Sequence, residues 1–92
     1  MNLQNRVCVV TGGGSGIGAA GVRCFARAGA QVVVADRNGE AAATVAAETG
    51  GLAVTVDVGD EHSVDRLVAE TLSRHGRIDV LWANAGDHAV DA

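Results

Sequence analysis

Hydrophobic and polar positions follow two patterns along this chain. Short unbroken apolar runs rich in valine alternate with longer stretches in which apolar residues recur at helical spacing. The short runs predict buried strands and the longer stretches predict amphipathic helices. We expect strands over residues 6–10, 31–35, 52–56 and 79–83. We expect helices over residues 17–28, 40–49 and 60–75, with glycines 29, 50 and 51 suited to ending the first two.

Two of the expected helices carry a recognisable apolar stripe. In the last helix the stripe consists of Val64, Leu67, Val68 and Leu72. In the first helix it consists of Ile17, Val22, Phe25 and Ala26. On the polar side of the last helix, Glu70 and Arg74 are spaced as an i,i+4 ion pair. Each stripe predicts the face that packs on a sheet.

Strands and helices alternate throughout, and the loops between them are short. Such alternation requires parallel strands joined by right-handed crossovers. The fold class is therefore α/β, a Rossmann-type doubly wound parallel sheet of four strands, in the expected order 3-2-1-4, with three helices. The whole chain, residues 1–92, is expected to be a single but incomplete domain. A ligand site is expected at the carboxyl ends of the strands, between the first and the fourth.

The stretch TGGGSGIG, residues 11–18, joins the first expected strand to the first expected helix. A glycine loop at this place lets backbone N–H groups approach the oxygens of a diphosphate, which also gains from the positive end of the helix. The G-x-G-x-x-G spacing fits in two registers, Gly16-Gly18-Gly21 and Gly14-Gly16-Ala19. No lysine follows the loop, which excludes the phosphate loop of nucleoside triphosphatases.

Charged residues follow two further strands. Asp36 comes directly after the second strand, where a carboxylate can accept hydrogen bonds from both hydroxyls of an adenosine ribose and would repel a 2′-phosphate. NAD is therefore preferred over NADP. The neighbouring Arg37 could partly reverse that preference, stack on adenine, or be a solvated turn residue. Asp57 and Val58 follow the third strand, where an adenine edge would lie, and Asp57 could also cap the next helix.

Composition narrows the functional classes. The formal net charge is −4, and the seven basic residues are all scattered arginines, so no basic stripe is available to bind a nucleic acid. Cys8 and Cys24 lack companions at ligand spacing, which predicts two buried thiols and no metal site. We see neither a secretory leader nor an apolar segment of ~18 residues that could cross a membrane. A cytoplasmic protein without a membrane partner is expected.

The glycine loop resembles the TGxxxGxG pattern of the short-chain dehydrogenase/reductase family, with Thr11, Gly12, Gly16 and Gly18 at its fixed places. Two further segments, DV at 57–58 and GRIDVLWANAG at 76–86, are similar to family segments in order and spacing. The resemblance covers essentially the whole chain up to Gly86. It implies an oxidoreductase that interconverts alcohols and ketones by transferring hydride to or from a nicotinamide dinucleotide.

The resemblance also implies roles for individual residues. The pyrophosphate and nearby ribose would be contacted by Gly12, Ser15, Gly16, Ile17 and Gly18. The adenosine ribose would lie at Asp36 and Arg37, and the adenine at Asp57 and Val58. The ribose at the nicotinamide end would be lined by Asn84, Ala85 and Gly86. The family often has Asn-Asn-Ala-Gly there, whereas this chain has Ala83 in place of the first asparagine, which implies slight loosening.

Catalysis in the family depends on a serine and on a Tyr-x-x-x-Lys pair in a later helix. This chain contains neither tyrosine nor lysine, so we expect no catalytic residue within it. The apolar run at 79–83 would leave an edge and a face open, through which two copies could associate. Three interpretations remain: the nucleotide-binding part of a longer oxidoreductase, a non-enzymatic dinucleotide-binding module, and a degenerate remnant.

Overall fold

A computed structural model describes residues 2–84 of the chain. The elements are β1 (Val7–Thr11), α1 (Gly16–Arg27), β2 (Gln31–Asp36), α2 (Gly39–Thr49), β3 (Leu52–Thr55), α3 (Glu61–His75) and β4 (Val80–Ala83). All seven elements expected from the sequence are present, and none of their ends is displaced by more than one residue. No helix among the described residues is long and apolar enough to span a membrane.

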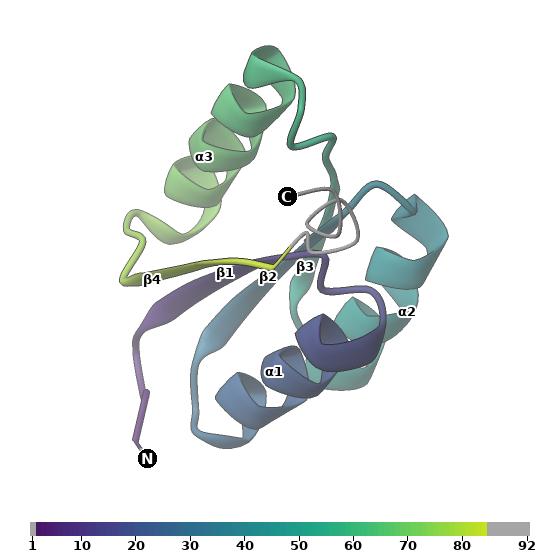
Figure 1. The fold of residues 1–92 in the computed structure, drawn as a ribbon. Helices are drawn as coiled ribbons and strands as arrows, with labels where there is room; N and C mark the ends of the chain where they lie inside the picture. The colour runs from purple at the N-terminus through teal and green to yellow at the C-terminus, as the bar shows by residue number, and fades with distance from the viewer. Residues whose placement is uncertain (1, 85–92) are drawn as a thin grey trace.

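The four strands form one parallel sheet in the order β3-β2-β1-β4, as the sequence predicts. The helices α1 and α2 lie on one side of this sheet and α3 lies on the other (Figure 1). This division follows from the right-handed crossover rule, because the chain moves in one direction from β1 to β3 and in the opposite direction from β3 to β4. We call the two sides the α1/α2 face and the α3 face.

The α1/α2 face is closed by a continuous apolar core. Its buried residues are Val10, Ala19, Val22, Val32, Val34, Ala42, Val45 and Ala46. The Trp82 indole of β4 packs against this core and meets the ring of Phe25 edge to face, with 6.1 Å between ring centroids. A Cβ atom built on Gly21 of α1 would collide with the Trp82 ring, so this glycine is required for close packing of the helix on β4. Trp82 itself is half-buried.

The α3 face has a second core, and it corrects the expected stripe of α3. The buried residues of this helix are Ser63, Leu67 and Thr71, while Leu72 is 45% exposed. Two polar side chains can be buried because each forms a hydrogen bond nearby. The Ser63 hydroxyl accepts from the backbone N–H of Asp57 (2.9 Å), and the Thr71 hydroxyl donates to the Leu67 carbonyl (2.8 Å).

Three further expectations are wrong. Ile17 is 71% exposed and Cys24 is exposed, because these residues are two helical turns apart on the side of α1 that faces away from the sheet. Only Cys8 is a buried thiol. The ion pairs among residues 2–84 are Arg6–Asp79, Arg23–Glu48 and Arg77–Asp79, so the expected Glu70–Arg74 pair is not formed.

Asp79 anchors the start of β4 to β1. Its carboxylate accepts a hydrogen bond from the Val7 backbone N–H (2.8 Å) and two from the Arg77 guanidinium (2.9 and 2.7 Å). A nitrogen of Arg6 lies 3.6 Å away. The bonds from Arg77 first, and the bond from Val7 second, lower the pKa of Asp79 below its ordinary value. The carboxylate therefore helps to fix the edge strand in register.

Candidate functional site

The candidate site is built around the glycine loop, residues 12–18, which joins the carboxyl end of β1 to α1. Two positions in this loop have a left-handed backbone, Gly12 with φ of 66° and Gly16 with φ of 58°. Residues other than glycine rarely adopt this backbone conformation, so the turn itself favours glycine at both positions. Apart from its own chain neighbours, no atom of residues 2–84 lies within 4 Å of a Cβ built on Gly16, so the described part of the protein leaves space beside the loop here.

Three other glycines of the loop are required because the protein packs closely on itself. A Cβ on Gly18 would collide with the Gly12 carbonyl and come within 2.8 Å of the Asn84 amide nitrogen. A Cβ on Gly13 would lie 2.9 Å from Val34, and one on Gly14 would lie 2.7 Å from Ala41. The loop backbone therefore lies so close to β2, α2 and Asn84 that there is no room for a side chain at these three positions.

The N-terminus of α1 differs from those of the other two helices in the described part of the chain. In α2 the Asn38 side chain accepts from the Ala41 N–H, and in α3 the Asp60 side chain accepts from the His62 N–H. The N-cap of α1 is Ser15, whose side chain makes no such bond, and its first turn holds no acidic residue. The positive end of this helix therefore has no side-chain acceptor among residues 2–84, and a negative charge at such a place is stabilised by roughly 0.3–2 kcal/mol.

Asp36, at the end of β2, contacts the glycine loop directly. One carboxylate oxygen accepts from the Gly14 N–H (2.9 Å) and the other accepts from the Asn38 N–H (3.0 Å). A carboxylate is thus placed beside the loop, as the sequence predicts. The adjacent Arg37 is exposed and forms no ion pair with the carboxylates of residues 2–84.

The residues after β3 lie at the same edge of the sheet, and the structure assigns them local roles. The Asp57 carboxylate accepts from the Gly59 N–H (2.9 Å) within the turn that leads to α3. Capping of α3 belongs to Asp60, so the expectation that Asp57 could be the cap is wrong. The backbone N–H of Val56 donates to the Asp36 carbonyl (3.0 Å), which connects this turn to the end of β2. Val58 is 39% exposed.

Asn84, the last described residue, directly follows β4. Its amide lies beside Gly18, at the junction of the glycine loop and α1. The structure therefore brings together the loop, Asp36 and Asn84 from three neighbouring strand ends. Ala85 and Gly86, the other two residues expected there, lie outside the described residues. No three His, Cys, Asp or Glu side chains between residues 2 and 84 are grouped in a way that could hold a metal ion.

Sequence reasoning missed the packing role of Gly13 and Gly14. Neither belongs to the fixed places of the TGxxxGxG pattern, yet each contacts a side chain that is more than 20 residues away in the sequence. The absence of any larger residue between positions 12 and 14 was the only available signal.

Residues 6–92 match the family described as short chain dehydrogenase. The chain belongs to the short chain dehydrogenase family. A sorbitol dehydrogenase of Cereibacter sphaeroides is 46% identical over 87 residues, which cover 92% of this chain and 34% of that protein. The chain thus spans about a third of the length of the curated relatives that it matches.

Solved structures of similar sequence confirm that the Rossmann-type sheet is that of the short chain dehydrogenases. A 3-ketoacyl-(acyl-carrier-protein) reductase of Brucella melitensis, solved with NADH, superposes with a TM-score of 0.85 at 41% identity. The match covers 87% of this chain and 34% of that one. A structure named ribose-5-phosphate isomerase, from Brucella melitensis 16M, gives a TM-score of 0.89 at 46% identity, covering 92% and 33%. Because the names of these neighbours differ in reaction, the likeness fixes the fold and the family only.

Proposed function

We propose that this chain is the dinucleotide-binding part of a short chain oxidoreductase and that its preferred cofactor is NAD. The observation that carries the proposal is the uncapped start of α1, which adjoins a glycine loop hydrogen-bonded to a carboxylate. An anion is favoured at the helix start, whereas a hydrogen-bond donor such as a ribose hydroxyl is favoured next to Asp36. A dinucleotide carries both groups, and a structural neighbour was solved with NADH.

The residues divide into groups by the part of the dinucleotide they would hold. The diphosphate and nearby ribose would be bound by Gly12, Ser15, Gly16, Ile17 and Gly18. The adenosine end would be bound by Asp36, Arg37, Asp57 and Val58, and the nicotinamide ribose by Asn84, Ala85 and Gly86. The exposed side chain of Ile17 fits this role, because a residue that faces solvent at the first turn of α1 can cover a bound ligand. A nicotinamide dinucleotide supplies a hydride acceptor or donor to this fold.

The whole protein would oxidise alcohols or reduce ketones, as several relatives are named for doing. This chain has no tyrosine and no lysine, so the proton transfer that accompanies hydride transfer in the family has no residue to perform it here. We expect the 92-residue chain to bind the dinucleotide without turnover. Measurable oxidation of sorbitol or 2,3-butanediol with NAD by the purified chain would contradict this part of the proposal.

Binding is tested by titrating the chain with NADH and NADPH and following nicotinamide fluorescence or heat. We expect NADH to bind more tightly, because the Asp36 carboxylate repels the 2′-phosphate of NADPH. Asp36→Asn removes that charge but keeps one oxygen that can accept from Gly14. It should raise the NADPH-to-NADH affinity ratio about tenfold, which corresponds to ~1.4 kcal/mol.

The matched control is Asp65→Asn, which removes the same charge from an exposed position on α3. It should leave the affinity ratio unchanged. Because a ratio is compared, a modest loss of folded protein affects both cofactors equally. Absence of binding by a cooperatively folded wild-type chain, or an equal ratio in wild type and Asp36→Asn, would refute the assigned site.

A further inference from the structure

Asn38 and Gly39, at the start of α2, form a chemically labile pair. The other asparagines of the chain are followed by Leu3, Arg6 and Ala85, so this is the one Asn-Gly sequence present. Glycine has no Cβ to shield its backbone nitrogen and rotates more freely than other residues, so that nitrogen can attack the preceding asparagine amide. Asn38 is also exposed to solvent. The residue pair by itself therefore favours deamidation of Asn38.

This deamidation needs only water as a co-reactant. The Gly39 nitrogen loses its proton and bonds to Cγ of Asn38, while the Cγ–Nδ2 bond breaks and ammonia leaves with that proton. The product is a cyclic imide that joins the side chain of Asn38 to the main chain. Water then adds to one of the imide carbonyls and opens the ring, which yields aspartate or isoaspartate. No group is oxidised or reduced, and either product carries a negative charge that asparagine lacks.

The folded backbone at Asn38 prevents ring closure. The Gly39 nitrogen can reach Cγ only when it lies on the same side of the Cα–C bond as Cβ, whereas the ψ of Asn38 is 99°, which places that nitrogen on the far side. Rotation into the reactive conformation would also turn the Asn38 carbonyl away from the Ala42 N–H that donates to it (3.1 Å). The Asn38 Oδ1 is engaged as well, because it accepts from the Ala41 N–H (3.1 Å). Deamidation therefore requires the first turn of α2 to open.

The first turn of α2 is held beside the end of β2 by a few polar contacts. The Asn38 N–H donates to one carboxylate oxygen of Asp36 (3.0 Å), and the other oxygen accepts from the Gly14 N–H (2.9 Å). The bonds that Asn38 makes to Asp36 and Ala41 are both in exposed positions. Segments held by exposed hydrogen bonds open at a lower free energy than a buried core. We expect this turn to open locally while the sheet stays folded.

The structure also explains why a labile pair is found at this place. Asparagine is among the best N-cap residues, and Asn38 caps α2. A Cβ built on Gly39 would lie 2.6 Å from Thr55 Oγ1, so a side chain here would press against β3. Capping and packing thus favour these two residues, and the same folded geometry suppresses their reaction.

We propose that Asn38 is a site of spontaneous deamidation that the folded start of α2 suppresses and that local opening of this turn releases. The extent of reaction then records how often the turn has opened. An aspartate product keeps an N-cap as good as asparagine. An isoaspartate product lengthens the main chain by a carbon atom, so residue 38 cannot cap α2 and keep its bond to Asp36 in the same geometry. The proposal does not depend on the cofactor.

The first test compares deamidation of the 92-residue chain in buffer and in urea, at the same neutral pH and temperature, by trypsin digestion and mass spectrometry. Trypsin cleaves after Arg37 and Arg66, and the peptide 38–66 contains no asparagine or glutamine besides Asn38. A mass increase of this peptide therefore reports on that residue alone. The reaction in buffer should be at least about tenfold slower than in urea. Equal rates in the two solvents would overturn the proposal.

The tryptic peptide 1–6 provides an internal control for the chemistry. It contains Asn2 and Asn5, neither of which is followed by glycine. In urea, where no fold protects any of these residues, Asn38 should react at least about tenfold faster than either of them. A rate for Asn38 no higher than theirs would show that the pair is not labile, which would also overturn the proposal.

Two substitutions distinguish local opening from unfolding of the whole chain. Asp36→Ala removes the carboxylate that ties the start of α2 to the glycine loop, and Asp79→Ala removes the one that holds β4 to β1. For each variant, the rate in buffer is divided by the rate in urea. Asp36→Ala should raise this ratio about fivefold, and Asp79→Ala should leave it unchanged. Equal increases would mean that only the unfolded chain reacts and would refute local opening.

The two products test the geometry at residue 38 directly. After reaction in urea and refolding, the aspartate and isoaspartate forms are separated by chromatography and melted. The aspartate form, which is identical to the variant Asn38→Asp, should melt within about 2 °C of the wild type, and the isoaspartate form at least about 4 °C lower. Equal midpoints would refute the part of the proposal that concerns the isoaspartate product.

Discussion

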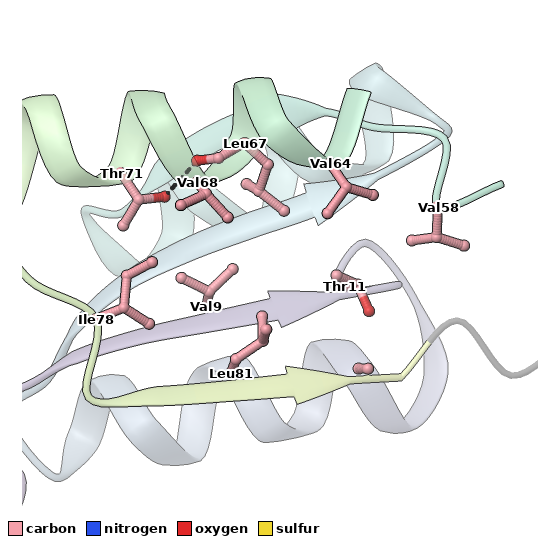
Figure 2. A pocket seen from close by; sticks show the side chains of 10 residues that line it. Val9, Thr11, Val58, Val64, Leu67, Val68, Thr71, Ile78 and Leu81 are labelled. Atoms are coloured by element: carbon pink, nitrogen blue, oxygen red, sulfur yellow. Dashed lines mark hydrogen bonds between the residues drawn. The ribbon is translucent and has the colours of Figure 1, made fainter. Parts of the chain in front are cut away.

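The two faces of the sheet share the same four strands but are covered to different extents. On the α1/α2 face, two helices, Phe25 and Trp82 enclose a continuous core. On the α3 face a single helix covers β1, β2 and β3, and the surface between that helix and β4 remains a groove (Figure 2). Four large hydrophobic residues between positions 2 and 84 are exposed, and three of them, Val58, Leu72 and Leu81, are on or beside the α3 face.

The difference shows how a doubly wound sheet is completed along the sequence. Both helices of the α1/α2 face come from the crossovers that link β1, β2 and β3, and Trp82 of β4 completes the core beneath them. The α3 face receives its helices only from crossovers that begin at β3 and beyond. The residues that we propose to bind the cofactor come mainly from the glycine loop and the end of β2, which belong to the closed face.

The substitution Gly21→Ala, on the closed α1/α2 face, should have the largest effect on the stability of the protein. A methyl group on Gly21 would overlap the Trp82 ring, so the ring or α1 would have to shift and the packing of Trp82 on Phe25 would be disturbed. Alanine gains about 1 kcal/mol in helix propensity, but the overlap should outweigh it and destabilise the protein by about 1–3 kcal/mol net. Urea unfolding measures this change. Unchanged stability would show that the Trp82 contact is looser than described.

The two cysteines allow a second comparison, between a thiol buried beneath the closed face and one exposed on the helix that covers it. Cys8 is fully buried on β1 and burial, followed by the charge of Asp79, raises the pKa of its thiol, whereas Cys24 is exposed on α1. A thiol reagent such as DTNB should modify Cys24 at once and Cys8 at least about a hundredfold more slowly. Cys24→Ser identifies the fast phase. Two equally fast phases would mean that the closed core opens readily.

The pH dependence of stability tests whether Asp79 holds the amino end of β4 in place. Its pKa is lowered in the folded state, so its contribution to stability is complete above its ordinary value near 3.8 and is lost as the pH falls through the lower folded value. Wild type should therefore lose more stability than Asp79→Asn when the pH is lowered from 5 to about 3. Melting curves of both proteins across this range measure the difference. Parallel losses would exclude Asp79 as the cause.

Val68→Leu should have the smallest effect, and with the opposite sign to Gly21→Ala. The extra methylene enters the groove, where there is room for it, and should be neutral or stabilising by up to about 0.8 kcal/mol. Both substitutions enlarge a helix side chain that faces the sheet. If Val68→Leu destabilises as much as Gly21→Ala, the contrast between a closed and an open face is wrong.

The sequence predicted the architecture closely because each strand and helix has a clear local pattern. The errors arose where the pattern could not specify a partner. Ile17 and Leu72 are apolar residues at helical spacing, yet one faces solvent beside the glycine loop and the other flanks the groove. Ser63 and Thr71 are polar and buried, because local hydrogen bonds compensate for burial in a way that hydropathy does not reveal.

The candidate site was predictable to a similar degree. The glycine spacing and the acidic residue after β2 pointed to the residues that the structure brings together. Two details were not predicted. Asp36 accepts a hydrogen bond from Gly14, and Asp60 rather than Asp57 caps α3. Both depend on tertiary geometry. The expected roles of the site residues toward a cofactor remain predictions.

Under the proposed function, the bond from the Gly14 amide to Asp36 means that the same side chain would both select the cofactor and hold the glycine loop. Conversion to NADP use by replacing Asp36 with a small apolar residue would relieve the repulsion but leave that amide without its acceptor. A successful redesign should therefore retain an oxygen at position 36 and add positive charge elsewhere around the ribose. Selectivity in this protein would then evolve by changes near the carboxylate before changes to it.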